Sequence, residues 1–122
     1  MQKVYLGFGA ATAFPSVCMY AMAPGGTVQH FGGAITNSSK FWCSTAASGD
    51  ILVIFWNLVA LHYNNKIPEI TKNVVRGNFI FSIFHFGAFW YWHVKGDPHP
   101  QGVAMYPFAL AVAFASLLAW GR

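Results

Sequence analysis

The sequence predicts an all-α integral membrane protein, a four-helix bundle with both termini on the same, inner side of the membrane. Of the 122 residues, 56% are apolar and only 8% are charged, whereas about a quarter of the residues in a soluble domain are charged. Four apolar stretches also approach the roughly 20 residues that a helix needs to cross a bilayer. We therefore expect one domain, residues 1–122, with four transmembrane spans.

The first predicted span covers residues 4–23, and Pro15 is expected to kink it. This stretch is long enough to cross the membrane, so we interpret it as a span and not as a cleavable signal. The segment that follows, APGGTVQHFGG, holds a proline and four glycines. These residues predict that the helix ends and that a loop begins.

The second predicted span covers residues 40–62 and contains Asp50, for which two interpretations are open. If Asp50 is an N-cap, the helix after it has about 13 residues and a length of about 20 Å, which is too short to cross. If the helix begins near Ser39 or Lys40, with serines as caps, it has full length and Asp50 lies near the middle of the bilayer. We favour the second interpretation.

The third and fourth predicted spans cover residues 77–94 and 103–120, with Pro107 near the start of the last one, where proline is tolerated. Four spans place both termini and the middle connection on one side of the membrane. That side holds Lys3, Lys66, Lys72, Arg76 and Arg122, and the other side holds Lys40 and Lys95. This excess of basic residues predicts that the first side faces the cytoplasm, matrix or stroma.

Asp50 and His85 each lie about ten residues from the outer end of a span, or about 15 Å deep in the membrane. Asn57 shares a helix face with Asp50, and Asn78 approaches the depth of Asn57. These four residues predict an intramembrane polar seam between the second and third spans. Two roles are open for it: a hydrogen-bonded clamp between helices, or a proton relay or headgroup site.

Three histidines, His62, His85 and His93, lie within the spans or at their ends and are candidate ligands of a haem or a pigment. A bis-histidine haem is disfavoured because His62 lies nearer the inner face and His93 nearer the outer face. A pigment such as chlorophyll needs one imidazole with apolar walls. The run FHFGAFWYWH offers these, although it equally suits a packed helix with an aromatic belt.

Small residues recur at four-residue spacing on two predicted spans, at Gly9 and Ala13 and at Ala111, Ala115 and Ala119. Such stripes allow helices to approach closely in lipid, either within the bundle or against a neighbouring subunit.

The sequence contains no GxGxxG, P-loop, HExxH or GxSxG motif, so we assign no catalytic residue. Cys18 and Cys43 have no CxxC spacing, so we assign no metal site; a disulfide and two buried thiols both remain open for them. The basic residues are scattered between apolar runs, which argues against nucleic acid as a partner.

These observations favour a non-catalytic accessory subunit of a larger energy-transducing membrane complex, either respiratory or photosynthetic. Its expected partners are other membrane subunits and membrane lipids. No cofactor is required, and bound lipid, chlorophyll, carotenoid or haem are the candidates. The expected location is the mitochondrial inner membrane first and the thylakoid membrane second. The alternative is a small membrane enzyme or carrier that acts on a lipid or quinone through Asp50 and His85.

Overall fold

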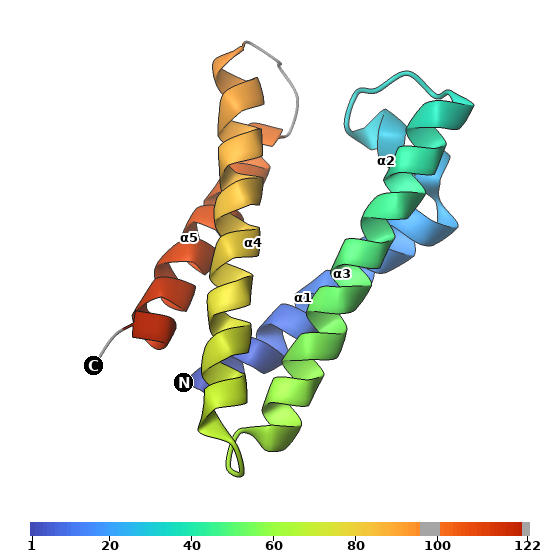
Figure 1. Ribbon diagram of the computed structural model, residues 1–122. Coiled ribbons are helices and arrows are strands. Elements are labelled where there is room, and N and C mark those ends of the chain that lie inside the picture. Colours follow the sequence, from blue (N-terminus) through green and yellow to red (C-terminus); the bar gives the residue numbers. More distant parts are fainter. Residues whose placement is uncertain (96–100, 121–122) are drawn as a thin grey trace. The chain divides into compact units, whose positions relative to one another are not determined.

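The computed structural model describes residues 1–95 and 101–120, and the side chains of these residues except 92, 93 and 101–105. Five helices account for the regular secondary structure of the described residues (Figure 1). They are α1 (Gln2–Met22), α2 (Pro24–His30), α3 (Asn37–Tyr63), α4 (Pro68–Val94) and α5 (Gln101–Trp120). The predicted all-α class is confirmed for this part of the chain.

The chain divides into two compact units. The N-terminal unit, Lys3–His62, contains nearly all of α1, α2 and α3. The C-terminal unit contains α4 and α5 and consists of Tyr63–Arg122 together with Met1–Gln2.

Helix α2 corrects the prediction that a loop follows the first span. Pro24 occupies the start of α2, where the missing N–H of proline removes no helical hydrogen bond. The Thr27 hydroxyl lies within hydrogen-bonding distance of the carbonyl oxygens of Met19 (2.8 Å) and Ala23 (2.9 Å), which ties α2 to the end of α1. The proline and glycines of this segment therefore shape a short helix and do not prevent one.

The chain leaves α2 through a Schellman motif made by two glycines. Gly32 has a φ of 73°, in the left-handed region that favours glycine. Its N–H donates to the carbonyl of Gln29, and the N–H of Gly33 donates to the carbonyl of Val28, both at 2.9 Å. This paired hydrogen bonding is a common way to end a helix.

Helix α3 begins well before Asp50, so Asp50 is not its N-cap. The Thr36 hydroxyl accepts a hydrogen bond from the Ser39 N–H (3.0 Å), and the Ser39 hydroxyl accepts one from the Thr36 N–H (2.9 Å). This reciprocal pair has the geometry of a capping box. The helix then continues for 27 residues, or about 40 Å, and Asp50 lies in its interior, as the length argument predicts.

Helix α4 also has 27 residues and begins nine positions before the predicted third span. The polar segment 68–76, expected to be part of a connection, forms the first turns of this helix. Pro68 begins it, where its fixed φ suits a helix, and no glycine or proline follows until Gly77. The connection between α3 and α4 is therefore only residues 64–67.

Two of the described helices, α1 and α3, are long and apolar enough to cross a membrane. Only 11% of the apolar window of α1 and 17% of that of α3 is buried, whereas the core helix of a soluble protein is mostly buried. The described apolar part of α5, Tyr106–Trp120, is shorter. Helix α4 carries polar turns at its start and Asn, His, Trp and Tyr residues along its apolar half, which lower its hydropathy.

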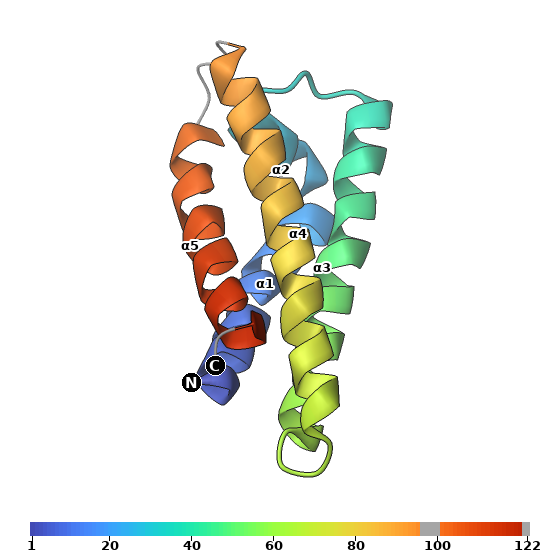
Figure 2. The same ribbon diagram turned by 60° about the vertical axis from the view of Figure 1, so that its left-hand side comes forward.

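Helices α4 and α5 pack against each other and lie side by side in both views (Figure 1 and Figure 2). Their ring contacts show that they run antiparallel. Phe79, early in α4, contacts Trp120 at the end of α5, and Phe89, late in α4, contacts Phe108 near the start of α5. Aromatic side chains thus connect the two helices over most of their length.

Candidate functional site

The imidazole of His85 is held by its own helix. Its Nδ1 lies 3.0 Å from the carbonyl oxygen of Phe81, one turn earlier in α4. A carbonyl oxygen only accepts hydrogen bonds, so Nδ1 carries the hydrogen in this contact. In the neutral ring, the lone pair available for a metal or a proton is then on Nε2.

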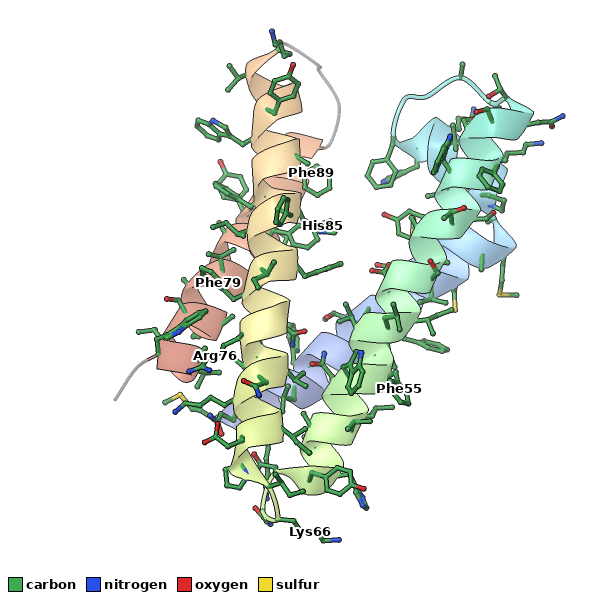
Figure 3. All side chains as sticks on the ribbon, in the orientation of Figure 1. Phe55, Lys66, Arg76, Phe79, His85 and Phe89 are labelled. Carbon is green, nitrogen blue, oxygen red and sulfur yellow. The ribbon has the colours of Figure 1, made fainter. Side chains whose placement is uncertain are left out.

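Aromatic rings from α4 and α5 surround this imidazole. The ring centroids of His85 and Phe108 are 4.9 Å apart with 20° between the planes, and the Phe81 ring lies 4.1 Å away. Phe89 contacts Phe108 at 5.5 Å. His85 and Phe89 project from the same side of α4 in Figure 3. We call His85, Phe81, Phe89 and Phe108 the His85 cluster.

The cluster fixes the orientation of the imidazole and leaves one nitrogen for a ligand. His85 is half-buried, and its contacts in the described part of the chain are the Phe81 carbonyl and the Phe81 and Phe108 rings. Because a nitrogen lone pair lies in the plane of the ring, stacking against the ring faces does not consume it. The His85 cluster is therefore a pre-oriented donor in apolar surroundings.

In the N-terminal unit, Asn57 lies against α1. Its side chain is fully buried, and a Cβ atom added at Gly9 would be 2.9 Å from Asn57 Nδ2. The sequence prediction placed Asn57 in a seam with the third span and Gly9 in a small-residue stripe. Within the N-terminal unit the structure brings Asn57 and Gly9 together, and the absence of a side chain at Gly9 leaves room for the amide. The seam with the third span stays a prediction.

Asp50 lies near α1 as well. Its carboxyl group interacts electrostatically with the phenol of Tyr20 on α1. Sequence reasoning missed this neighbour because tyrosines near the end of a span are ordinarily interpreted as interfacial residues. Cys18 and Cys43, in the same unit, are both free thiols, which answers the question of a disulfide between them.

The pairing of Asp50 with His85 stays a prediction. Asp50 and Asn57 belong to the N-terminal unit, and Asn78 and His85 belong to the C-terminal unit. Of the other candidate ligands, His62 is exposed near the end of α3. His93 lies in α4, and its side chain is outside the described residues.

The small residues differ in their burial. Ala115 and Ala119 on α5 are almost fully buried, whereas Ala111, Gly9 and Ala13 are half-buried. The buried alanines lie on the helix whose main partner is α4.

A second feature of the C-terminal unit was not found from the sequence. The Arg76 guanidinium lies over the Trp120 ring, 5.7 Å from its centroid, and Phe79 meets the same ring edge-on at 4.9 Å. In the view of Figure 3, Arg76 and Phe79 lie to the left of α4 and His85 lies to the right. The sequence does place a basic residue near the start of one span and a tryptophan at the end of the next. That the two side chains meet depends on the register of α5 against α4, which only the structure shows.

Compared with family models, curated proteins and solved structures, the chain has no match in any of the three.

Proposed function

We propose that the chain is a non-catalytic accessory subunit of a larger energy-transducing membrane complex, with α1, α3, α4 and α5 crossing the bilayer. In this role it packs against other subunits and lipids and offers the His85 cluster to a pigment or haem. No motif in the sequence supplies a reaction that the chain would perform by itself.

The observation that carries the proposal is the amount of apolar surface left exposed. Large apolar side chains are exposed on all four long helices. They include Phe8 and Phe14 on α1, Trp42, Phe55 and Trp56 on α3, Phe84 and Trp90 on α4, and Phe114 and Leu117 on α5. In water such a surface marks a site of association, and in a bilayer it is covered by lipid or by neighbouring subunits.

The exposed hydroxyl groups of α1 and α3 are also compatible with lipid. The Thr12 hydroxyl donates to the Phe8 carbonyl (2.9 Å), and the Thr45 hydroxyl donates to the Phe41 carbonyl (2.9 Å). Ser48 makes a similar bond to the carbonyl of Thr45 at 2.6 Å. These polar groups are satisfied within their own helix, as the hydrocarbon core of a membrane requires.

Basic and aromatic residues at the two ends of its apolar half support a spanning α4. Arg76 lies over Trp120, and Lys95 lies over the ring of Tyr91, 5.6 Å from its centroid. Arg76 and Lys95 are about 19 positions apart, or about 28 Å along a helix. The hydrocarbon core is about 30 Å thick, and aromatic and basic side chains gather at its two borders. This spacing supports a crossing although the hydropathy of α4 alone does not.

The proposed orientation places both termini and the α3–α4 connection on the inner side, because five of the seven basic residues lie there. The proposed membrane is the mitochondrial inner membrane, with the thylakoid membrane as the second choice. Both house complexes with haem or chlorophyll, the two ligand classes that suit the His85 cluster.

Native electrophoresis tests the accessory role. The tagged chain is expressed in its own cell, the membranes are extracted with a mild detergent, and the extract is separated without denaturation. The proposal predicts that the tag migrates with a complex many times heavier than the 13.4 kDa chain. Quantitative migration as a free chain in its detergent micelle would contradict it.

A further inference from the structure

We propose that His85 binds the central metal of a tetrapyrrole, a haem or a chlorophyll-type pigment, as its single axial ligand through Nε2. The sequence contains three candidate ligands for such a group, His62, His85 and His93. The structure distinguishes His85 from the other two by a defined tautomer and a defined ring orientation.

The tautomer of His85 is the first feature that favours a metal partner. Metal-binding histidines in proteins almost always donate their second ring N–H to a carbonyl or carboxylate, which fixes the ring and raises the basicity of the ligating nitrogen. The 3.0 Å contact between Nδ1 of His85 and the carbonyl oxygen of Phe81 is a bond of this kind. The acceptor is a backbone carbonyl of α4, so the bond needs no second side chain, only the rotamer of His85 seen here.

The surroundings of the ring are the second feature. Phe81 and Phe108 lie against the imidazole and Phe89 adjoins Phe108, so the donor is set among flat apolar groups. Ala88, three positions after His85, has a small and exposed side chain. Residues at this spacing share a helix face, so on this side a flat macrocycle can approach the helix, whereas Ser82, three positions before His85, is buried.

The number of ligands that the protein supplies decides which class of metal partner fits. A bare zinc or copper ion needs three or four protein ligands, and the described residues contain no group of three or more His, Cys, Asp or Glu side chains able to hold one. A tetrapyrrole brings four nitrogen ligands of its own and asks the protein for one more. A carotenoid has no metal for the lone pair to bind, and a lipid headgroup would use it only as a hydrogen-bond acceptor.

This assignment competes with the predicted pairing of Asp50 and His85. Because Nδ1 is bonded to Phe81, Nε2 is the only ring nitrogen left for either partner. A metal at Nε2 excludes any hydrogen bond between that nitrogen and the carboxyl group of Asp50. The two hypotheses therefore make opposite predictions for the same variants.

The inference deepens the accessory role and rests on it, since it names one partner class of the proposed subunit. The two can nevertheless fail separately. Migration with a large complex combined with no tetrapyrrole binding would overturn this inference alone. Saturable tetrapyrrole binding by a chain that always migrates alone would overturn the accessory role alone.

The experiment is a titration of the purified full-length chain in detergent micelles. Two probes are used: ferric haem b, and zinc protoporphyrin as a stable substitute for magnesium pigments. We expect saturable binding of one tetrapyrrole per chain with a shifted Soret band for at least one probe. Binding of haem alone identifies a haem site, and binding of the zinc compound identifies a pigment-type site. Non-saturable partition of both probes, equal to that into empty micelles, would overturn the inference.

Variants assign the ligand. His85→Ala is expected to weaken binding by roughly tenfold or more, and millimolar imidazole is expected to restore the Soret band. The matched control is His62→Ala, which removes the exposed histidine of α3 and should leave the titration unchanged. If His85→Ala does not fold, as judged by circular dichroism, His85→Gln keeps a polar side chain of similar size and is expected to lose the axial ligand. Unchanged binding in a folded His85 variant would contradict the assignment.

Discussion

The backbone of Gly9 in α1 lies directly against the side-chain amide of Asn57 in α3. A Cβ atom at Gly9 would be 2.9 Å from Nδ2 of Asn57, closer than a carbon and a nitrogen normally approach. Asn57 is fully buried, so its side chain has little room to move away. This contact holds the two membrane-length helices of the N-terminal unit at a defined position along each other.

We predict that Gly9→Ala lowers the free energy of unfolding by about 1–3 kcal/mol relative to Gly7→Ala, the cost of overpacking a tight contact. The control is matched because a Cβ at Gly7 meets nothing within 4 Å, while both changes gain the same helix propensity. Unfolding of the purified chain in mixed micelles measures the difference. If the two variants are equally stable, the contact has no energetic weight.

Shortening Asn57 should relieve the clash. Gly9→Ala combined with Asn57→Ser is expected to be more stable than the sum of the two single effects, because the smaller side chain leaves room for the new methyl group. Residues in contact typically show coupling energies of about 0.5–3 kcal/mol. Strict additivity in the same unfolding experiment would show that Gly9 and Asn57 do not determine each other's packing.

Helix length located Asp50 correctly inside a helix, because a helix that began at Asp50 would be too short to cross a membrane. Other features escaped prediction for physical reasons. The start of α4 was missed because segment 68–76 is polar, and polarity marks exposure, not the absence of a helix. The short helix α2 was missed because proline and glycine disfavour helix interiors but suit the first turn and the end of a helix.

The candidate site was predicted only in part. The sequence identified His85 as a candidate ligand, but the tautomer depends on a side-chain rotamer, and Phe108 reaches the imidazole only through the register of α5 on α4. The neighbour of Gly9 was missed for a similar reason. A stripe of small residues indicates that something approaches closely, without indicating which residue it is.

Removing the cap of α3 should loosen its first turn. Thr36→Ala deletes the hydroxyl that accepts the Ser39 N–H, and the loss of such a cap typically costs about 1 kcal/mol. We expect faster amide hydrogen exchange in the first turn of α3 and unchanged exchange around Asp50. Ser38→Ala, next along the chain, is the control. Equal exchange in both variants would mean that Thr36 does not cap the helix.

The contact between Arg76 and Trp120 should stabilise the packing of α4 on α5. Arg76→Gln is expected to lower the free energy of unfolding by about 1 kcal/mol, in the range of partly exposed cation–π pairs, and this effect should vanish in a Trp120→Leu background. Lys72→Gln, one turn earlier, makes the same change of charge at an exposed position and should have little effect. If Arg76→Gln destabilises the Trp120→Leu variant as much as the wild type, the effect comes from the charge of Arg76 and not from its contact with Trp120.

Two double-mutant cycles identify the partner of Asp50. Asp50→Asn should be tolerated because an amide still forms hydrogen bonds, whereas Asp50→Leu should cost on the order of 1 kcal/mol. A polar seam predicts coupling between Asp50→Leu and His85→Leu, and the electrostatic interaction between Asp50 and Tyr20 predicts coupling between Asp50→Leu and Tyr20→Phe. If His85 is instead an axial ligand, Asp50→Leu should be coupled to Tyr20→Phe and not to His85→Leu. Strict additivity with His85 would disprove the seam.

Helices α1 and α3 are apolar enough to cross the bilayer. The proposal of a four-span subunit therefore depends on whether α4 and α5 cross it as well. Labelling single cysteines with a membrane-impermeant maleimide tests this directly. Cys18 and Cys43 are free thiols, so replacing both with serine breaks no disulfide. Lys66→Cys and Lys95→Cys are then introduced separately at the two ends of α4. If α4 crosses the bilayer, the two cysteines are labelled from opposite sides of sealed membrane vesicles, and this is the expected result. Labelling of both from the same side would show that α4 does not cross, and it would contradict the four-span proposal.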